Sequence, residues 1–429
     1  MATVLYMPKW GSAMTQGKVV FWSKEEDEEV TAGEILVEIE TEKITNSVEA
    51  PVSGILRKIL IEAGDSAPVG AAIAVITDVE EEWDGEWQSL DNGSEAKESV
   101  ESSTVVTASN SVSVDGAEKK AVTPAARSLA KKRGIDISQL EPTSKSRITV
   151  EDILNYMAQK TGWPGSRFLP VGEWMIHYLD RGNGLPLVLL HGLGASCTAW
   201  QPNFFFLADH FRVLAPDLPG AGLSDKPVTE YTLEFYVNFL REFLDYLKID
   251  QCVILGNSLG GEIAAAVAHR FPGKVWGLIL EDSAGLGRDV AAELKPTVLN
   301  SVDKAGIRKL LELLFHDSQF IYPGTIEEMF NLRQQAGAFE ALESAVENLL
   351  TEDGQKVDIS EQLPELSLPT LVIWGEQDRI TPQSHGLKAV QQLPNGQLSV
   401  YENCGHCPHI EAAERFNQEV KSFVEKLML

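Results

Sequence analysis

The serine of the run Gly256-Asn257-Ser258-Leu259-Gly260 has the neighbours that a catalytic nucleophile needs. The apolar run CVIL precedes it and the helix-forming run GEIAAAVAHR follows. A Gly-x-Ser-x-Gly turn between a strand and a helix is so tight that glycine is needed beside the serine, and it projects the hydroxyl over the edge of a sheet. We therefore predict that Ser258 is a nucleophile of acyl chemistry.

A general base and the acid that orients it are expected after Ser258, in the order Ser, Asp, His. Asp378 follows the apolar run PTLVIW, and His406 follows LSVYE, so both belong at strand ends. We predict that His406 takes the proton of Ser258 and that Asp378 fixes the imidazole tautomer. Asp282, after the earlier run VWGLILE, stays open as a substitute acid.

The run His191-Gly192-Leu193-Gly194 follows an earlier apolar run and can direct backbone N–H groups at an oxyanion. We predict that the N–H groups of Leu193 and Leu259 form the oxyanion hole. His191 is expected to shape this loop rather than to act as the base.

Cys404 and Cys407 have the spacing of a redox dithiol, and His406 and His409 lie among them. A redox motif belongs early in a compact domain, whereas this one follows the last expected strand. Four ligands within six residues do not easily close a tetrahedron around zinc. We therefore predict no metal site here.

The elements that must position these residues alternate from about residue 165 onward. Apolar runs separated by helical stretches argue for a parallel sheet covered on both faces. Between Ser283 and Leu368 the strand pattern stops and amphipathic helices dominate, which predicts a lid at about 284–368. In motif order and spacing, residues 165–429 resemble the α/β-hydrolase family.

Lys43 lies at the centre of an internal repeat. Gly17 is followed sixteen residues later by Gly33, and Gly54 by Gly70, so two segments align at an offset of 37. A lysine between two such halves is expected on a turn, presented for covalent loading. Residues 1–78, read as short β segments, resemble the lipoyl domain family through the run ETEKI. Biotinyl domains share that fold but usually flank the lysine with Met, so the resemblance implies lipoate on Lys43.

An acidic stretch at 79–119, rich in Glu, Ser and Gly, has the composition of a flexible linker. A basic segment at 120–158 follows, with helices expected from Thr123-Pro124 to Gly134 and from Thr149. It resembles the peripheral-subunit-binding domains of 2-oxo acid dehydrogenase complexes. That resemblance implies docking of dihydrolipoamide dehydrogenase, of a thiamine-diphosphate-dependent decarboxylating component, or of both. The basic residues offered to an acidic partner are Arg127, Lys131, Lys132, Arg133, Lys145 and Arg147.

Composition sets the wider limits. The chain has 429 residues and a net charge of −27, which argues against nucleic acid as a partner. No apolar run approaches the roughly 18 residues that span a bilayer, and the N-terminal residues do not read as a secretory signal. Four cysteines form no disulfide framework, so we predict a cytoplasmic protein without a membrane partner.

A lipoyl domain, a subunit-binding domain and a hydrolase fold in series are similar to the acyltransferase component of acetoin dehydrogenase complexes. That similarity implies acetyl transfer from lipoyl-Lys43 to coenzyme A within a multienzyme complex, with thiamine diphosphate and FAD only on partner subunits. The His-x-x-x-Asp-Gly signature of the usual acyltransferase core is absent from the sequence. Two alternatives stay open: a hydrolase or thioesterase that releases the free acid, and a scaffold whose hydrolase domain has a separate role.

Overall fold

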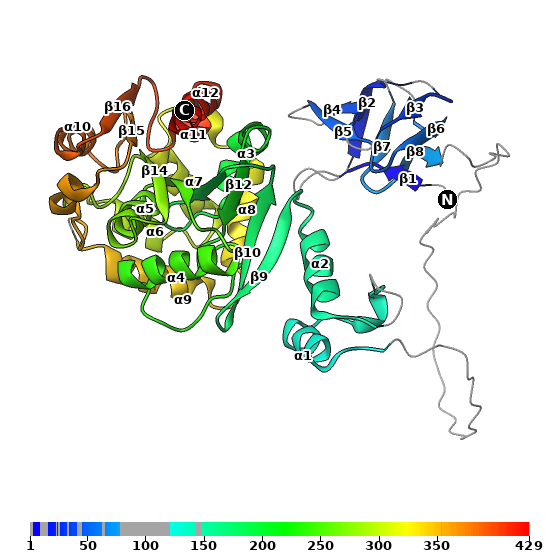
Figure 1. Ribbon diagram of the computed structural model, residues 1–429, viewed down its shortest axis with the longest axis horizontal. Coiled ribbons are helices and arrows are strands. Elements are labelled where there is room, and N and C mark those ends of the chain that lie inside the picture. The colour runs from blue at the N-terminus through cyan, green and yellow to red at the C-terminus, as the bar shows by residue number, and fades with distance from the viewer. Residues whose placement is uncertain are drawn as a thin grey trace. The chain divides into compact units, whose positions relative to one another are not determined.

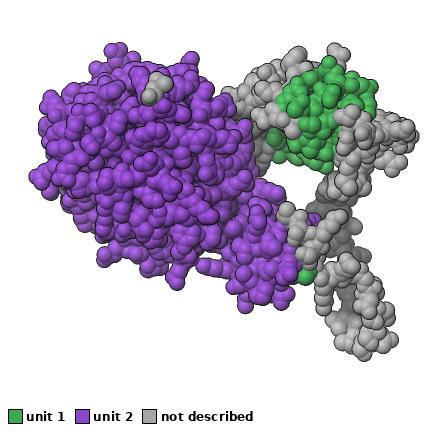
Figure 2. Space-filling view, in the orientation of Figure 1, with its two compact units in different colours: residues 1–121 green, residues 122–429 purple. Residues whose placement is uncertain are grey.

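The computed structural model describes residues 3–8, 16–22, 24, 26–31, 34–40, 45–61, 65–77, 121–142, 147–352 and 354–428. The chain forms two compact units, residues 1–121 and 122–429 (Figures 1 and 2). The predicted linker at 79–119 lies outside the described residues.

The first unit consists of two four-stranded sheets, with strand orders β1-β8-β6-β3 and β5-β4-β2-β7. Its strands are β1 (Thr3–Tyr6), β2 (Gln16–Trp22), β3 (Glu29–Val30), β4 (Ile35–Glu40), β5 (Thr45–Glu49), β6 (Gly54–Ile59), β7 (Ser66–Pro68) and β8 (Ala72–Thr77). Alternate side chains such as Leu36, Leu56 and Ile73 are buried between the sheets. This two-sheet sandwich agrees with the all-β domain predicted for 1–78.

The predicted repeat is visible in the strand pairing. Adding 37 to the residues of β4 gives the residues of β8. Strand β2 pairs with β4 and with the short β7, and in the same way β6 pairs with β8 and with the short β3. Each half therefore lends one short strand to the sheet of the other half. These two short strands escaped the sequence prediction because two or three residues show no alternation.

A small helical segment opens the second unit, with helices α1 (Pro124–Arg133) and α2 (Val150–Thr161). The Thr123 hydroxyl accepts the Ala126 N–H, Pro124 occupies the first turn, and Gly134 ends the helix with φ of 63°. Thr149 begins α2 with a capping box, which satisfies two otherwise unpaired backbone donors. Both predicted helices are confirmed, and α2 continues three residues beyond the expected boundary at 158.

An eight-stranded sheet of order β16-β15-β14-β13-β11-β12-β10-β9 forms the centre of the second unit (Figure 1). Its strands are β9 (Ser166–Val171), β10 (Trp174–Arg181), β11 (Pro186–Leu190), β12 (Arg212–Pro216), β13 (Cys252–Asn257), β14 (Val275–Glu281), β15 (Thr370–Gly375) and β16 (Gly396–Tyr401). From β12 to β16 all neighbours are parallel, and β9 and β10 form an antiparallel edge. The six predicted parallel strands are confirmed, whereas the antiparallel pair was not identified separately.

Helices cover both faces of this sheet, as the apolar runs predicted. Helices α4 (Leu233–Tyr246), α5 (Leu259–Arg270) and α10 (Gln383–Gln392) pack on one face, and α3 (Gln201–Ala208) and α12 (Ala413–Leu427) on the other. Within β13, the side chain of Ile254 packs in the hydrophobic core on the face covered by α4, α5 and α10. The side chains of Val253 and Leu255 pack in the core on the opposite face, under α3 and α12. The alternation of a strand thus fixes the direction of each side chain.

The predicted lid contains helices α6 (Leu294–Leu299), α7 (Lys304–Leu314), α8 (Pro323–Arg333) and α9 (Ala338–Leu349), between β14 and β15. Apolar side chains such as Ile307 and Val346 bury the inner faces of these helices. A last short helix, α11 (Pro408–Glu411), precedes α12. Among the described residues, no helix is long and apolar enough to cross a membrane.

Candidate active site

Ser258 lies at the turn between β13 and α5, with φ of 54° and ψ of −119°. Left-handed φ values are strained for residues other than glycine and cost on the order of 1–3 kcal/mol, and they concentrate at functional sites. A Cβ on Gly256 would lie 2.1 Å from the Gly260 oxygen, and one on Gly260 would lie 2.2 Å from the Leu190 oxygen. Only glycine therefore fits at positions 256 and 260, which agrees with the glycine requirement predicted for a nucleophile elbow.

His406 and Asp378 meet at the carboxyl ends of β16 and β15. The His406 Nδ1 lies 2.9 Å from the Asp378 Oδ2, and both side chains are almost fully buried. The other Asp378 oxygen accepts the Ile380 N–H, and Thr381 donates to Oδ2. Burial alone would raise the pKa of Asp378, but His406 and these donors hold it below its ordinary value. Asp378 is therefore an ionised partner that orients His406.

Asp282, the substitute acid left open by the sequence, lies in the same cluster but makes a different contact. Its Oδ1 accepts the Gly375 N–H at 2.9 Å, whereas Asp378 holds the hydrogen bond to His406. Burial and the neighbouring charge of Asp378 raise the pKa of Asp282 well above its ordinary value. The geometry thus favours Asp378 as the orienting acid, while Asp282 binds the backbone N–H of Gly375.

Leu193 and Leu259, whose N–H groups were predicted to form the oxyanion hole, both line the cavity that Ser258 lines. Neither donates a hydrogen bond to any described residue, as expected for N–H groups that await an oxyanion. His191 shapes this loop: its Nδ1 lies 2.8 Å from the Gly192 oxygen, and its Nε2 accepts the Leu218 N–H. Because both ring nitrogens are engaged and the ring is buried, His191 has a structural role.

Ser258 and His406 line one cavity of about 230 Å³. No hydrogen bond joins them among the described residues, and catalytic hydrogen bonds often tighten only when substrate is bound. The cavity walls are mainly apolar and come largely from the lid, including Val298, Leu311 and Leu350. Such walls exclude water from an ester formed on Ser258.

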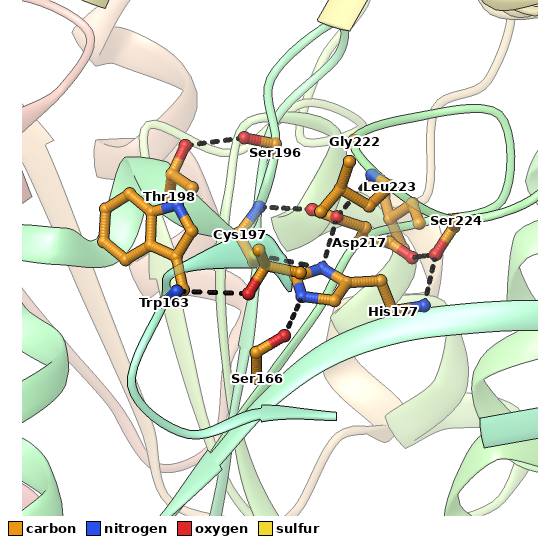
Figure 3. Close-up of polar contacts among 12 residues, drawn as sticks. Trp163, Ser166, His177, Ser196, Cys197, Thr198, Asp217, Gly222, Leu223 and Ser224 are labelled. Carbon is orange, nitrogen blue, oxygen red and sulfur yellow. Dashed lines mark hydrogen bonds and ion pairs between the residues drawn. The ribbon is translucent and has the colours of Figure 1, made fainter. Parts of the chain in front are cut away.

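A second serine, histidine and aspartate arrangement is visible in Figure 3. The Ser166 hydroxyl lies 2.8 Å from the His177 Nε2, and the His177 Nδ1 lies 2.8 Å from the Asp217 Oδ2. All three side chains are buried and none lines the cavity. Asp217 also accepts the N–H groups of Cys197 and Leu223. This network therefore braces the loops beside the predicted oxyanion site and is separate from the cavity that Ser258 lines.

The thiols of the Cys404 and Cys407 pair are free and buried. Burial raises the pKa of Cys404 to about 12 and that of Cys407 well above its ordinary value. Reactive cysteines are thiolates in electropositive, accessible surroundings, so this geometry disfavours the redox alternative.

Lys43, the predicted attachment site, lies outside the described residues, as do its neighbours 41–44. The residues on either side are described: Glu40 ends β4, Thr45 begins β5, and the two are register partners in an antiparallel pair. Strands β4 and β5 are therefore antiparallel partners, and the predicted lysine lies in the sequence between them. This flanking geometry fits a covalently carried group.

The basic residues of the small helical segment differ in their surroundings. Arg133 forms a two-pronged ion pair with Asp225 of the loop after β12, at 2.7 and 2.8 Å. No ion pair is recorded within the described parts for Arg127, Lys131, Lys132 or Arg147, and Lys145 lies outside them. The exposed side chains of Arg127 and Arg147 remain available to a partner, whereas the charge of Arg133 is already paired.

One cavity residue had no role in the sequence prediction. Glu262, one turn along α5 from Ser258, lines the cavity and is 3% exposed. A signal was present in the sequence, because Glu262 is the only charged residue in the run LGGEIAAAVA. Acidic residues are rarely buried, so a glutamate among small apolar residues of a buried helix stands out as a candidate functional residue.

Comparison with known families agrees with this architecture. The family model described as "alpha/beta hydrolase fold" matches residues 186–413, "Biotin-requiring enzyme" matches 3–76 and "e3 binding domain" matches 121–154. The chain therefore belongs to the α/β-hydrolase fold family, with a biotinyl/lipoyl-type domain and an E3-binding domain before the hydrolase domain.

Relatives fall into two groups. The dihydrolipoyllysine-residue acetyltransferase component of the acetoin cleaving system of Pseudomonas putida is 29% identical over 98% of both chains. A 2-hydroxy-6-oxononadienedioate/2-hydroxy-6-oxononatrienedioate hydrolase of Burkholderia vietnamiensis is 34% identical but covers 59% of this chain and 92% of its own. The solved structure of a meta-cleavage product hydrolase from Pseudomonas fluorescens is 28% identical, with a TM-score of 0.56 over 60% of this chain and 97% of its own.

Proposed function

We propose that this chain is the lipoyl-bearing acyltransferase component of an acetoin dehydrogenase-type complex, and that it transfers an acetyl group from lipoyl-Lys43 to coenzyme A through Ser258. The observation that carries the proposal is the extent of the two similarities. The acetyltransferase relative matches all three domains, whereas the hydrolase relative matches only the last. Because a lipoyl-type domain and the Ser258 site belong to one chain, the acyl group attached to the lipoyl domain is the expected substrate of Ser258.

The steps follow from the site. The Ser258 oxygen attacks the thioester carbonyl while His406 takes the hydroxyl proton, and the carbon–sulfur bond breaks as that proton passes to the leaving sulfur. The thiol of coenzyme A then attacks the acyl-serine, His406 takes the thiol proton, and the proton returns to Ser258. Asp378 stabilises the imidazolium in both steps, and the N–H groups of Leu193 and Leu259 bind both oxyanions.

A lipoyl group on Lys43 would supply a thiol that carries the acyl group as a thioester. In the sequence, that lysine falls between β4 and β5, which are paired strands of one compact domain. An attached group then meets the site at a high effective concentration, which reaches roughly millimolar for short flexible connections.

The E3-binding domain supports docking of dihydrolipoamide dehydrogenase, of the thiamine-diphosphate-dependent component, or of both. We propose Arg127, Lys131, Lys132 and Arg147 as the contacts, since their charges are unpaired in the described structure. The cytoplasmic location stays a prediction.

Hydrolysis is the second candidate. A hydrolase relative is 34% identical over 59% of this chain, and the triad would resolve an acyl-serine with water equally well. The two functions differ only in what reaches the acyl-serine second. The apolar lid favours a thiol on a long substrate arm over bulk water.

The variant Ser258→Ala, made in the full chain and reconstituted with its partner enzymes, tests both acyl transfer and hydrolysis. We expect acetyl-coenzyme A formation to fall by about 10³-fold or more, because removing the nucleophile of a triad leaves only binding and the oxyanion hole. Acetyl-coenzyme A and acetate are measured together. Unchanged acetyl-coenzyme A formation would remove Ser258 from the mechanism, and acetate as the sole wild-type product would establish hydrolysis instead.

A further inference from the structure

Glu262 stands four residues after Ser258 on helix α5. Ser258 is the N-cap of that helix, and the Glu262 N–H in the first turn donates to the Ser258 carbonyl oxygen at 3.2 Å. Both side chains line the cavity between the sheet and the lid. A group bound through its carbonyl at Ser258 therefore extends past Glu262 if it enters the lid side of the cavity.

The carboxyl of Glu262 lines the cavity and has no protein partner among the described residues. It makes no hydrogen bond or ion pair with any residue that the structure describes, and the charged neighbour that most affects it is another acid, Asp358. A Cβ on Gly285 would lie 2.8 Å from the Glu262 Cγ, so the backbone packs against the stem of this side chain. Its packed stem limits how far the side chain can move to find another partner.

Burial, followed by the charge of Asp358, raises the pKa of Glu262 to about 8. Near neutral pH the group is mainly the protonated acid, which offers one O–H donor. A neutral acid kept in an apolar cavity can bind an oxygen of a ligand, as carboxylic acids do in some oxyanion sites.

The cavity is larger than an acetyl group requires. An apolar cavity of about 150 Å³ holds a benzene molecule, and this cavity measures about 230 Å³. Side chains of Leu294, Val298, Leu349 and Leu350 surround the space, so most of a longer acyl chain would meet apolar walls. Among the described residues, two acidic side chains line this cavity, Glu328 of the lid and Glu262, and Glu262 is the one that follows Ser258 on α5.

We propose that Glu262 is a specificity residue that hydrogen-bonds an oxygen substituent on the acyl chain, a few bonds from its reactive carbonyl. The preferred substrate class is then hydroxyacyl or oxoacyl thioesters in addition to acetyl. This inference rests on the proposed role of Ser258 as the acyl acceptor.

The test compares Glu262→Leu and Glu262→Gln with the wild-type full chain. The substrates are p-nitrophenyl esters and coenzyme A thioesters of acetate, butyrate, 3-hydroxybutyrate and acetoacetate. We expect kcat/KM of the wild type to favour the oxygen-bearing four-carbon substrates over butyrate by about tenfold, the usual effect of one good hydrogen bond. Glu262→Leu abolishes this preference without lowering the acetate rate, and Glu262→Gln retains most of it because its amide still donates.

Equal rates of the wild type on butyrate and on both oxygen-bearing substrates would overturn the proposal. An equal loss on all substrates in Glu262→Leu would also overturn it, because that result describes a structural residue. The melting temperature of Glu262→Leu should equal or exceed that of the wild type, since an unpaired polar group leaves the interior. A lower melting temperature would contradict a Glu262 carboxyl without a protein partner, on which the argument stands.

The outcomes also separate this inference from the proposed function. The esters could show a preference that depends on Glu262 while no acyl-coenzyme A forms from the carrier. That result would contradict the proposed acyl transfer and support the proposed role of Glu262. Formation of acyl-coenzyme A without any preference for oxygen-bearing substrates would support the proposed acyl transfer and contradict the proposed role of Glu262.

Discussion

At the residue scale, two buried carboxyls near His406 have pKa values shifted in opposite directions, and this difference supports separate roles. Asp378 is held ionised by His406, Thr381 and the Ile380 N–H. Asp282 lies in the same cluster, and burial together with the Asp378 charge raises its pKa. Two close carboxyls rarely ionise together, so ionisation of one keeps the proton on the other.

Asp378→Asn is expected to lower kcat by about 10⁴-fold, because an amide reverses the tautomer of His406. Asp282→Asn is expected to change kcat only slightly, because an amide resembles a protonated acid and its oxygen still accepts the Gly375 N–H. Steady-state kinetics on a p-nitrophenyl ester measures both. The reverse pattern, a large loss in Asp282→Asn alone, would exchange the two roles.

The sequence could propose these residues because each has a local signal. Ser258 is framed by glycines, and Asp378 and His406 follow apolar runs. Their convergence follows from the parallel sheet, which places the carboxyl ends of β13, β15 and β16 at one edge. Glu262 was not predicted, since an isolated charge in a helix has no motif and only the cavity gives it a context.

At the element scale, the short strands β3 and β7 and the edge pair β9 and β10 were the parts that pattern analysis did not resolve. Strands β3 and β7 have two and three residues, and their place depends on pairing across the repeat rather than on local propensity. Helices α1 and α2 were predicted at their starts because capping is local chemistry. The ion pair between Arg133 and Asp225 joins residues far apart in sequence and had no local signal.

That ion pair divides the basic residues of helix α1 into two classes. Arg127→Ala is expected to weaken partner docking by roughly two- to fivefold, the usual effect of one exposed charge. Arg133→Ala should leave the docking affinity nearly unchanged and increase protease cleavage between Gly162 and Gly165, since its two-pronged contact with Asp225 is lost. Titration calorimetry with dihydrolipoamide dehydrogenase and limited proteolysis measure the two effects. A stronger loss of docking in Arg133→Ala than in Arg127→Ala would place Arg133 in the partner interface.

At the scale of the whole molecule, the two ends of the chain carry complementary halves of one proposed reaction. The first unit repeats one strand pattern twice, and Lys43 falls in the sequence between its paired strands β4 and β5. The second unit holds the acyl site. If the carrier delivers the substrate, then complex turnover requires Lys43, whereas the chemistry at Ser258 on a freely diffusing ester does not.

Lys43→Arg separates these two requirements. We expect turnover of the reconstituted complex to vanish, because arginine cannot form the amide that attaches a lipoyl group, while kcat/KM for a p-nitrophenyl ester stays within about twofold of the wild type. Lys58→Arg is the matched control, since Lys58 is a half-exposed lysine of the same domain, paired with Glu26. Mass spectrometry of the intact chain reports whether the attached group is lost. Full turnover by Lys43→Arg would show that the acyl group reaches Ser258 without this carrier, and loss of ester activity would show that the variant disturbs the hydrolase domain itself.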